Sequence, residues 1–212
     1  DLILQNYLGY QEFMAYLRSS TTLTLTYIPS PEIGPYYCPV ELSSLSKTEV
    51  SRETGMLHCP IVFDQLGYWT HEEVLVFGES METSTVEEYY PLRYPLAYGK
   101  SPTTPNILSI AIRNDGDVPC PLKLSLFGQG IQPTWKLGEQ EGGLNLTILT
   151  DQTVHIDSRE NVMLIYSGET LLDAMKDHTK QNYLYSPVGE STLEISNVAR
   201  AEVILYEQFL SV

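Results

Sequence analysis

The fold of this chain is constrained most by two segments in which apolar residues alternate with other residues. They lie on either side of a turn-forming stretch. Residues 108–113 read LSIAIR and residues 122–127 read LKLSLF, so that leucine and isoleucine recur at every second position in both. A period of two places the apolar side chains of a strand on one face, against a core. Residues 114–119, NDGDVP, are turn formers, and we therefore expect a hairpin-type connection between two paired strands.

Further short segments of this kind follow, separated by glycine and proline. They predict strands at residues 144–149, 154–157, 162–166, 192–196 and 201–209, with a helical turn at 171–176. Short, regularly spaced strands are typical of a sandwich. The region from Tyr94 to Phe209 is thus predicted to be an antiparallel β-sandwich that serves assembly or recognition.

The first part of the chain has a different pattern. Apolar residues at spacings near 3.6 predict an amphipathic helix over residues 2–17, followed by strands at 22–27, 37–46 and 56–66. Periodicity is lost over residues 78–88, and the aromatic and proline-rich connector 89–95 follows. We therefore expect two domains, 1–92 and 93–212, in a mainly β protein.

Charge argues against nucleic acid as a partner. The net charge is -15, with 3 basic and 13 acidic residues in 1–92 (net -10) and 9 basic and 14 acidic residues in 93–212 (net -5). Such a chain repels phosphates, and no apolar run approaches the ~18 residues of a membrane span. An acidic stretch is either a solvated face or a wall past which a polyanion slides. If the chain assembles into a ring, the candidates for a position at its lumen or between its subunits are Glu72, Glu73, Glu79, Glu82, Glu87 and Glu88.

The sequence motifs of common enzymes and metal sites are missing or incomplete. No G-x-S-x-G turn occurs, Gly99-Lys100 stands alone, and the four histidines are far apart. Residues 114–117 resemble the start of a calcium loop, but the downstream carboxylate is missing, and a turn explains them. We therefore expect no enzyme, no cofactor and no metal site. Three scattered cysteines are interpreted as buried small hydrophobes: Cys38, Cys59 and Cys120.

Aromatic residues of the second part are the candidates for sugar or partner contacts. Fifteen tyrosines against five phenylalanines favour surfaces where a ring packs and a hydroxyl stays wet. The alternative for each of these side chains is packing in the core or at an interface. The candidates are Trp135, Tyr166, Tyr183 and Tyr185.

Several segments together resemble the distal tail protein of long-tailed bacteriophages. In the second part they are Tyr94-Pro95 and residues 114–121, 124–128, 132–134 and 156–158; in the first part they are residues 23–27, 42–49, 59–63 and Trp69. The resemblance implies an N-terminal belt domain followed by a galectin-like sandwich. The chain begins near the family's helix, so the belt is expected to lack its first strands and to be completed by another segment or chain.

The resemblance also implies a function. The protein would be a non-enzymatic structural component of a phage tail tip or baseplate, made in the host bacterial cytoplasm. It would form a hexameric ring that joins the tail tube to tail-associated or receptor-binding proteins. The alternative is a carbohydrate-binding module that recognises the host surface.

Overall fold

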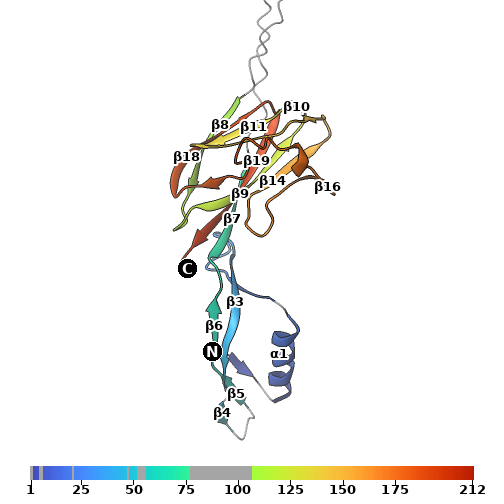
Figure 1. Cartoon of the computed structure of the whole chain (residues 1–212). Helices are drawn as coiled ribbons and strands as arrows, with labels where there is room; N and C mark the ends of the chain where they lie inside the picture. Colours follow the sequence, from blue (N-terminus) through green and yellow to red (C-terminus); the bar gives the residue numbers. More distant parts are fainter. Residues whose placement is uncertain (1, 5–6, 21, 47, 52–55, 77–106) are drawn as a thin grey trace, which may run out of the picture. The chain divides into compact units, whose positions relative to one another are not determined.

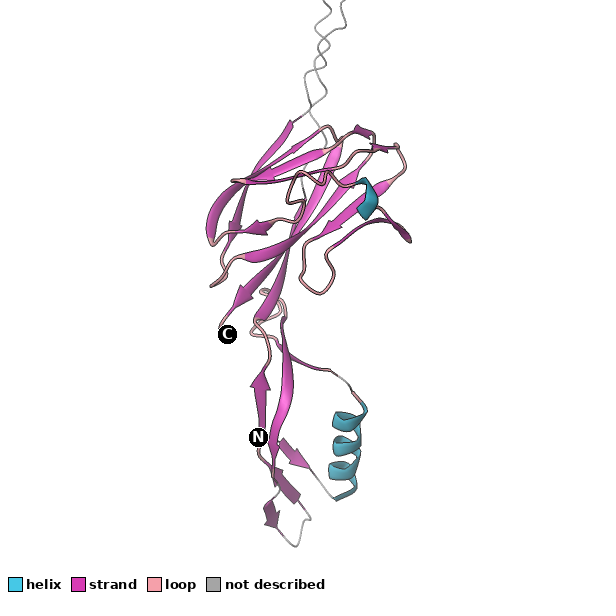
Figure 2. Ribbon diagram, in the orientation of Figure 1, coloured by secondary structure: helices cyan, strands magenta, loops and turns pink. Residues whose placement is uncertain are grey.

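The structure is a computed structural model that describes residues 2–4, 7–20, 22–46, 48–51, 56–76 and 107–212. The chain forms two compact units: unit 1 comprises Asp1–His71 with Gln208–Val212, and unit 2 comprises Glu72–Glu207. The fold is mainly β, with antiparallel sheets and a single α-helix among the described residues (Figure 2). The expected domain boundary at residues 92 and 93 lies outside the described residues and stays a prediction.

Unit 1 is built around a long strand. Its elements are β1 (Leu2–Leu4), α1 (Tyr7–Ser19), β2 (Leu23–Tyr27), β3 (Tyr36–Leu45), β4 (Thr48–Ser51), β5 (Met56–Cys59), β6 (Ile61–Gln65) and the start of β7 (Trp69–Val76). Strand β3 pairs with β2 through Val40 and Leu23 and with β6 through Val40 and Gln65, so β2 and β6 lie on opposite sides of it. Strand β5 lies between β1 and β4.

Three expectations for unit 1 need correction. Residues Leu2–Leu4 form a strand that pairs with β5, and the helix covers Tyr7–Ser19. The pairing with β5 outweighs the helical period, since tertiary context overrides weak local propensity. The strand predicted over residues 56–66 is interrupted at Pro60, which has no backbone N–H to donate. Strand β4 lies between the predicted strands 37–46 and 56–66, where no element was predicted.

Unit 2 is a sandwich of two sheets around one core. One sheet has the strand order β12-β11-β18-β8, and the other includes the order β16-β15-β14-β9-β19 (Figure 1). Their bounds are β8 (Ile107–Asn114), β9 (Cys120–Phe127), β11 (Thr134–Leu137), β12 (Gln140–Gly143), β14 (Thr153–Asp157), β15 (Leu164–Ser167), β16 (Thr170–Leu171), β18 (Gly189–Ser196) and β19 (Arg200–Phe209). Buried side chains from both sheets form a single apolar cluster that includes Leu122, Trp135, Ile156, Leu193 and Val203.

Shorter elements complete unit 2. They are β10 (Gly130–Ile131), β13 (Thr147–Ile148), β17 (Tyr185–Ser186) and the 3-10 turn η1 (Asp173–Met175). The turn confirms the helical turn predicted over 171–176. The strand predicted over 144–149 is reduced to Thr147–Ile148, which pairs with β10.

Strands β8 and β9 are present where the alternation predicts them, but the prediction of a hairpin between them is wrong. Strand β8 pairs with β18 in one sheet, while β9 pairs with β14 and β19 in the other. The connection therefore leads from one sheet to the other. Buried Asn114 shapes it: its Oδ1 accepts from Gly116 N at 2.9 Å, and its Nδ2 donates to the carbonyls of Val118 and Ser186 at 3.0 and 3.2 Å. These bonds explain the calcium-like residues as turn chemistry, and the described residues contain no group of three or more metal-ligating side chains.

Candidate assembly and binding surfaces

Unit 1 buries few apolar side chains and exposes many. Its buried apolar residues are Leu17, Cys38, Val40, Leu57 and Cys59. Among the described residues of this unit, the exposed large apolar residues are more than twice as numerous: Leu8, Tyr16, Leu25, Tyr27, Ile28, Ile33, Tyr37, Val62, Leu66, Tyr68, Leu210 and Val212. A unit of this size has a marginal core, so covering these side chains by a partner would add to its stability.

Two edges of the unit 1 sheet are open. Among the described residues, β2 and β6 each pair only with β3 and leave their outer edges unpaired. Strand β2 reads LTLTY, without the charge, proline or bulge that natural edges use against further pairing. The β2 edge is therefore competent to accept another strand. The β6 edge is also unpaired, although it carries one charged residue, Asp64.

Aromatic rings pack together where strands β2 and β3 meet the start of β7. Tyr36 stacks on His71 at 4.9 Å between ring centroids and meets Phe209 edge-on at 5.5 Å. Tyr27, the cross-strand partner of Tyr36, has a T-shaped contact with Trp69 at 6.4 Å. Such pairs contribute about 0.5–1.5 kcal/mol each beyond area burial. They hold the β2–β3 hairpin in place against the start of β7.

The acidic candidates are only partly described. Glu72 and Glu73 lie on β7 and are exposed, whereas Glu79, Glu82, Glu87 and Glu88 lie outside the described residues. Glu72 is close enough to Arg159 to influence it: the pKa of Arg159 is raised first by its hydrogen bond to Asp157 and more weakly by the charge of Glu72. The lumen position of these residues stays a prediction.

Trp135 is a core residue, which corrects its assignment as a candidate surface contact. Its side chain is 1% exposed, and its Nε1 donates to the Asn182 carbonyl at 2.9 Å. A Cβ at Gly142 would collide with the indole ring, so the glycine makes room for it. A ring held on all sides in this way is unavailable to a ligand.

The three tyrosine candidates are half-buried and have different surroundings. The Tyr183 hydroxyl lies 2.8 Å from both the Met163 carbonyl and the Asp173 carboxylate. The pKa of Tyr183 is raised mainly by burial and further by its hydrogen bond to Asp173. Tyr185 lies on β17, and burial raises its pKa as well. Tyr166 lies on β15, with its ring 5.0 Å from that of His155 and Lys123 Nζ 5.9 Å from its centroid. Tyr166 thus has an imidazole and an ammonium group against its ring, and Tyr183 has Lys176 Nζ 5.5 Å from its ring centroid.

A row of side chains crosses the solvent-facing side of this sheet. Glu202 is in register with Ser125, Ser125 with His155, and His155 with Tyr166, while their neighbours along each strand face the core. Ser125 Oγ and His155 Nδ1 are 2.9 Å apart. The pKa of His155 is lowered, first by burial and then by Lys123. Sequence reasoning missed this row, because its members are far apart in sequence and only strand pairing aligns them.

The Ser125–His155 pair is not arranged for nucleophilic catalysis. Ser125 is 3% exposed, so its hydroxyl is closed to a substrate carbonyl. Among the described residues, no carboxylate is hydrogen-bonded to His155 to orient its ring, as a catalytic base requires. The pair instead fixes the position of the imidazole.

Comparison with known proteins finds a family match for the first part of the chain and a similar fold for nearly all of it. Residues 2–66 match the family described as the distal tail protein, N-terminal domain. The fold is similar to a chain in the phage P2 baseplate in its activated conformation with Ca, at 17% identity over 98% of this chain and 75% of that chain, with a TM-score of 0.53. A chain of the same baseplate with Sr matches at 17% identity and the same coverage, with a TM-score of 0.52.

No curated protein sequence matches the chain. In the part of the chain that the structure describes, no helix is long and apolar enough to cross a membrane.

Proposed function

We propose, from the premise that this chain is a distal tail-like protein with a structural role in a phage tail or baseplate, that it forms a ring hub. Unit 1 would build a hexameric ring that continues the tail tube. The sandwiches would hold tail-associated or receptor-binding proteins. Neither role requires an active site or a cofactor.

The open sheet of unit 1 carries this proposal. A head-to-tail interface needs two different surfaces on each copy and closes into a ring when the rotation between copies allows it. The unpaired edges of β2 and β6 are two such surfaces, on opposite sides of β3. Pairing β2 of one copy with β6 of the next would satisfy backbone groups at both edges and cover apolar side chains that unit 1 leaves exposed.

The acidic residues would then serve the passage of DNA. Exposed Glu72 and Glu73, with the four acidic candidates outside the described residues, would line the lumen or face the neighbouring subunit. A lumen wall of the same sign as DNA prevents the polymer from sticking during ejection. A ring structure with all six residues on its outer surface would contradict this role.

The size of the purified full chain tests the ring. Sedimentation and electron micrographs are expected to show a six-fold ring, whereas a stable monomer at high concentration would contradict the proposal. The variants Leu25→Lys on β2 and Val62→Lys on β6 place a lysine on each edge, at side chains that are 39% and 50% exposed. Each variant alone is expected to stop ring formation, because a charged edge resists pairing.

Mixing the two variants distinguishes the proposed interface from general disruption. Each variant keeps one intact edge, so a mixture of Leu25→Lys and Val62→Lys chains should form heterodimers through the intact β6 and β2 edges, and should not form rings. Leu149→Lys is the matched control, since Leu149 is 61% exposed in unit 2 and should leave the ring unchanged. Heterodimers that fail to form would reject the β2–β6 pairing while leaving a ring by another interface open.

A further inference from the structure

The row Glu202, Ser125, His155 and Tyr166 crosses four adjacent strands of unit 2. Neighbouring strands are about 4.8 Å apart, so the row is about 14 Å long. We infer that this row and Lys123 beside it form a binding site for a neutral oligosaccharide. This function goes beyond the ring hub and does not depend on ring formation.

The row combines donors, acceptors and an aromatic ring, which sugar hydroxyls and sugar ring faces require together. The Glu202 carboxylate accepts hydrogen bonds and the Lys123 ammonium donates them. His155 uses Nδ1 toward Ser125 at 2.9 Å, and its other nitrogen has no hydrogen-bond partner among the described residues. Tyr166 supplies an amphipathic ring at one end of the row.

The side chains are held in place before a ligand binds. Ser125 is buried and fixes His155, the His155 ring packs against Tyr166, and Lys123 lies over the same tyrosine. Glu202, His155, Tyr166 and Lys123 are half-buried, so they remain reachable while their motion is restricted. Prior ordering lowers the entropic cost of binding.

Charge and polarity favour a neutral polyhydroxyl ligand over the alternatives. Lys123 and Glu202 act on His155 with opposite charges, and Arg159 is paired with buried Asp157 at 2.7 Å. The chain carries a net charge of -15, so a polyanion finds no net positive field. A protein partner would need a central apolar anchor. Of the exposed large apolar side chains that the structure describes in unit 2, Leu171 alone is in register with the row, and it lies at the end next to Tyr166.

An array of neutral and acidic bacterial oligosaccharides, probed with the full chain, tests the inference. The wild-type chain should bind at least one neutral oligosaccharide, with little change between about 0.15 and about 0.5 M salt because no ion pair is formed. Tyr166→Ala and Glu202→Gln should each weaken this binding about tenfold or more, which corresponds to losing one good contact. The matched controls Tyr185→Ala and Glu194→Gln should retain it, since Glu194 is exposed on the other sheet.

Three results would overturn the inference. They are no binding to any neutral oligosaccharide, binding restricted to acidic glycans and abolished by salt, or neutral binding that survives both row variants. Thermal unfolding of each variant separates a lost contact from a lost fold. Particle size in the same samples reports on the ring separately, so a failed sugar site leaves the hub proposal standing.

Discussion

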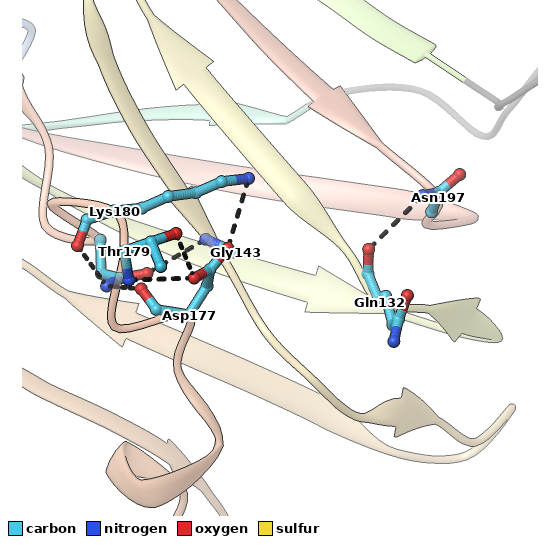
Figure 3. A network of polar contacts seen from close by, with 7 residues as sticks. Gln132, Gly143, Asp177, Thr179, Lys180 and Asn197 are labelled. Atoms are coloured by element: carbon cyan, nitrogen blue, oxygen red, sulfur yellow. Dashed lines mark hydrogen bonds and ion pairs between the residues drawn. The ribbon is translucent and has the colours of Figure 1, made fainter.

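Asn182 organises the loop that covers Trp135. Its backbone is in the left-handed region at φ +66, its Nδ2 donates to the carbonyls of Asp177 and Lys180 at 2.8 Å each, and its Oδ1 accepts from Gly143 N at 3.1 Å. Figure 3 shows the surrounding contacts, in which Asp177 Oδ1 also accepts from Thr179 N and Oγ1 at 3.0 and 2.6 Å. One buried amide thus binds three backbone groups and joins the loop 177–182 to Gly143.

We predict that Asn182→Asp destabilises unit 2 by about 2–4 kcal/mol at neutral pH, because a carboxylate would face two carbonyl oxygens to which it cannot donate. Urea unfolding measures the change. Asn197→Asp is the control: Asn197 is also left-handed, at φ +62, but is only half-buried, with a 3.4 Å contact to the Gln132 carbonyl (Figure 3). It should cost less than about 1 kcal/mol. Equal losses would show that backbone conformation, and not the buried amide, sets the cost.

His155 should make stability depend on pH. Its pKa in the folded state is lowered by burial and by Lys123, against the weaker opposing charges of Glu202 and Asp157. As pH falls, His155 therefore takes up a proton in the unfolded chain before it does so in the folded chain. Its contribution to stability is fully present above about pH 6.5, the pKa of the unfolded chain, and is lost as pH falls through the lower pKa of the folded chain. His155→Asn should flatten the pH dependence of the unfolding free energy in this window. His178→Asn, at an exposed position, should leave it unchanged.

At the scale of elements, helix α1 has one buried and one exposed side. Leu17 is 9% exposed and lines, with Leu23 and Val40, the groove between the helix and the sheet, whereas Leu8 is 61% exposed. Leu17→Ala should destabilise unit 1 by about 2–4 kcal/mol through lost burial and a residual cavity. Leu8→Ala should change its stability by less than about 0.5 kcal/mol. Chemical unfolding followed by Trp69 fluorescence checks both variants, and similar losses would contradict this packing.

The connection from β8 to β9 shows what local patterns leave open at this scale. Both strands were predicted from alternation, and Ile112, Leu122, Leu124 and Leu126 are buried as expected. The hairpin prediction was wrong because turn-forming residues are equally compatible with a connection that leads from one sheet to the other. Buried Asn114, which reaches Ser186 72 residues away, selects the corner.

At the scale of the whole molecule, the two units differ in how much core each one has. Unit 2 closes a large apolar cluster within one copy, while the described residues of unit 1 include more exposed large apolar side chains than buried ones. Stability that comes from association depends on protein concentration, whereas stability from an internal core does not. The units should therefore unfold in two transitions, of which only that of unit 1 moves with concentration.

The two tryptophans allow this to be measured, because Trp69 belongs to unit 1 and Trp135 to unit 2. In a Trp69→Phe chain, fluorescence should report a melting temperature that is constant over a hundredfold range of concentration. In a Trp135→Phe chain, the remaining signal should show a melting temperature that rises with concentration. A single concentration-independent transition for both reporters would contradict the association of unit 1.

The sequence by itself determined the mainly β class, the antiparallel strands at β2, β3, β8, β9, β14 and β19, and the burial of the three cysteines. These features depend on the spacing of apolar residues and on residue types within a few positions, which the local sequence contains. Tertiary structure alone decided that residues 2–4 pair with β5, that β8 and β9 belong to different sheets, and that Trp135 is core while Tyr166 joins a surface row. Pairing partners and register are set by contacts between distant segments, whose free energy no local pattern contains.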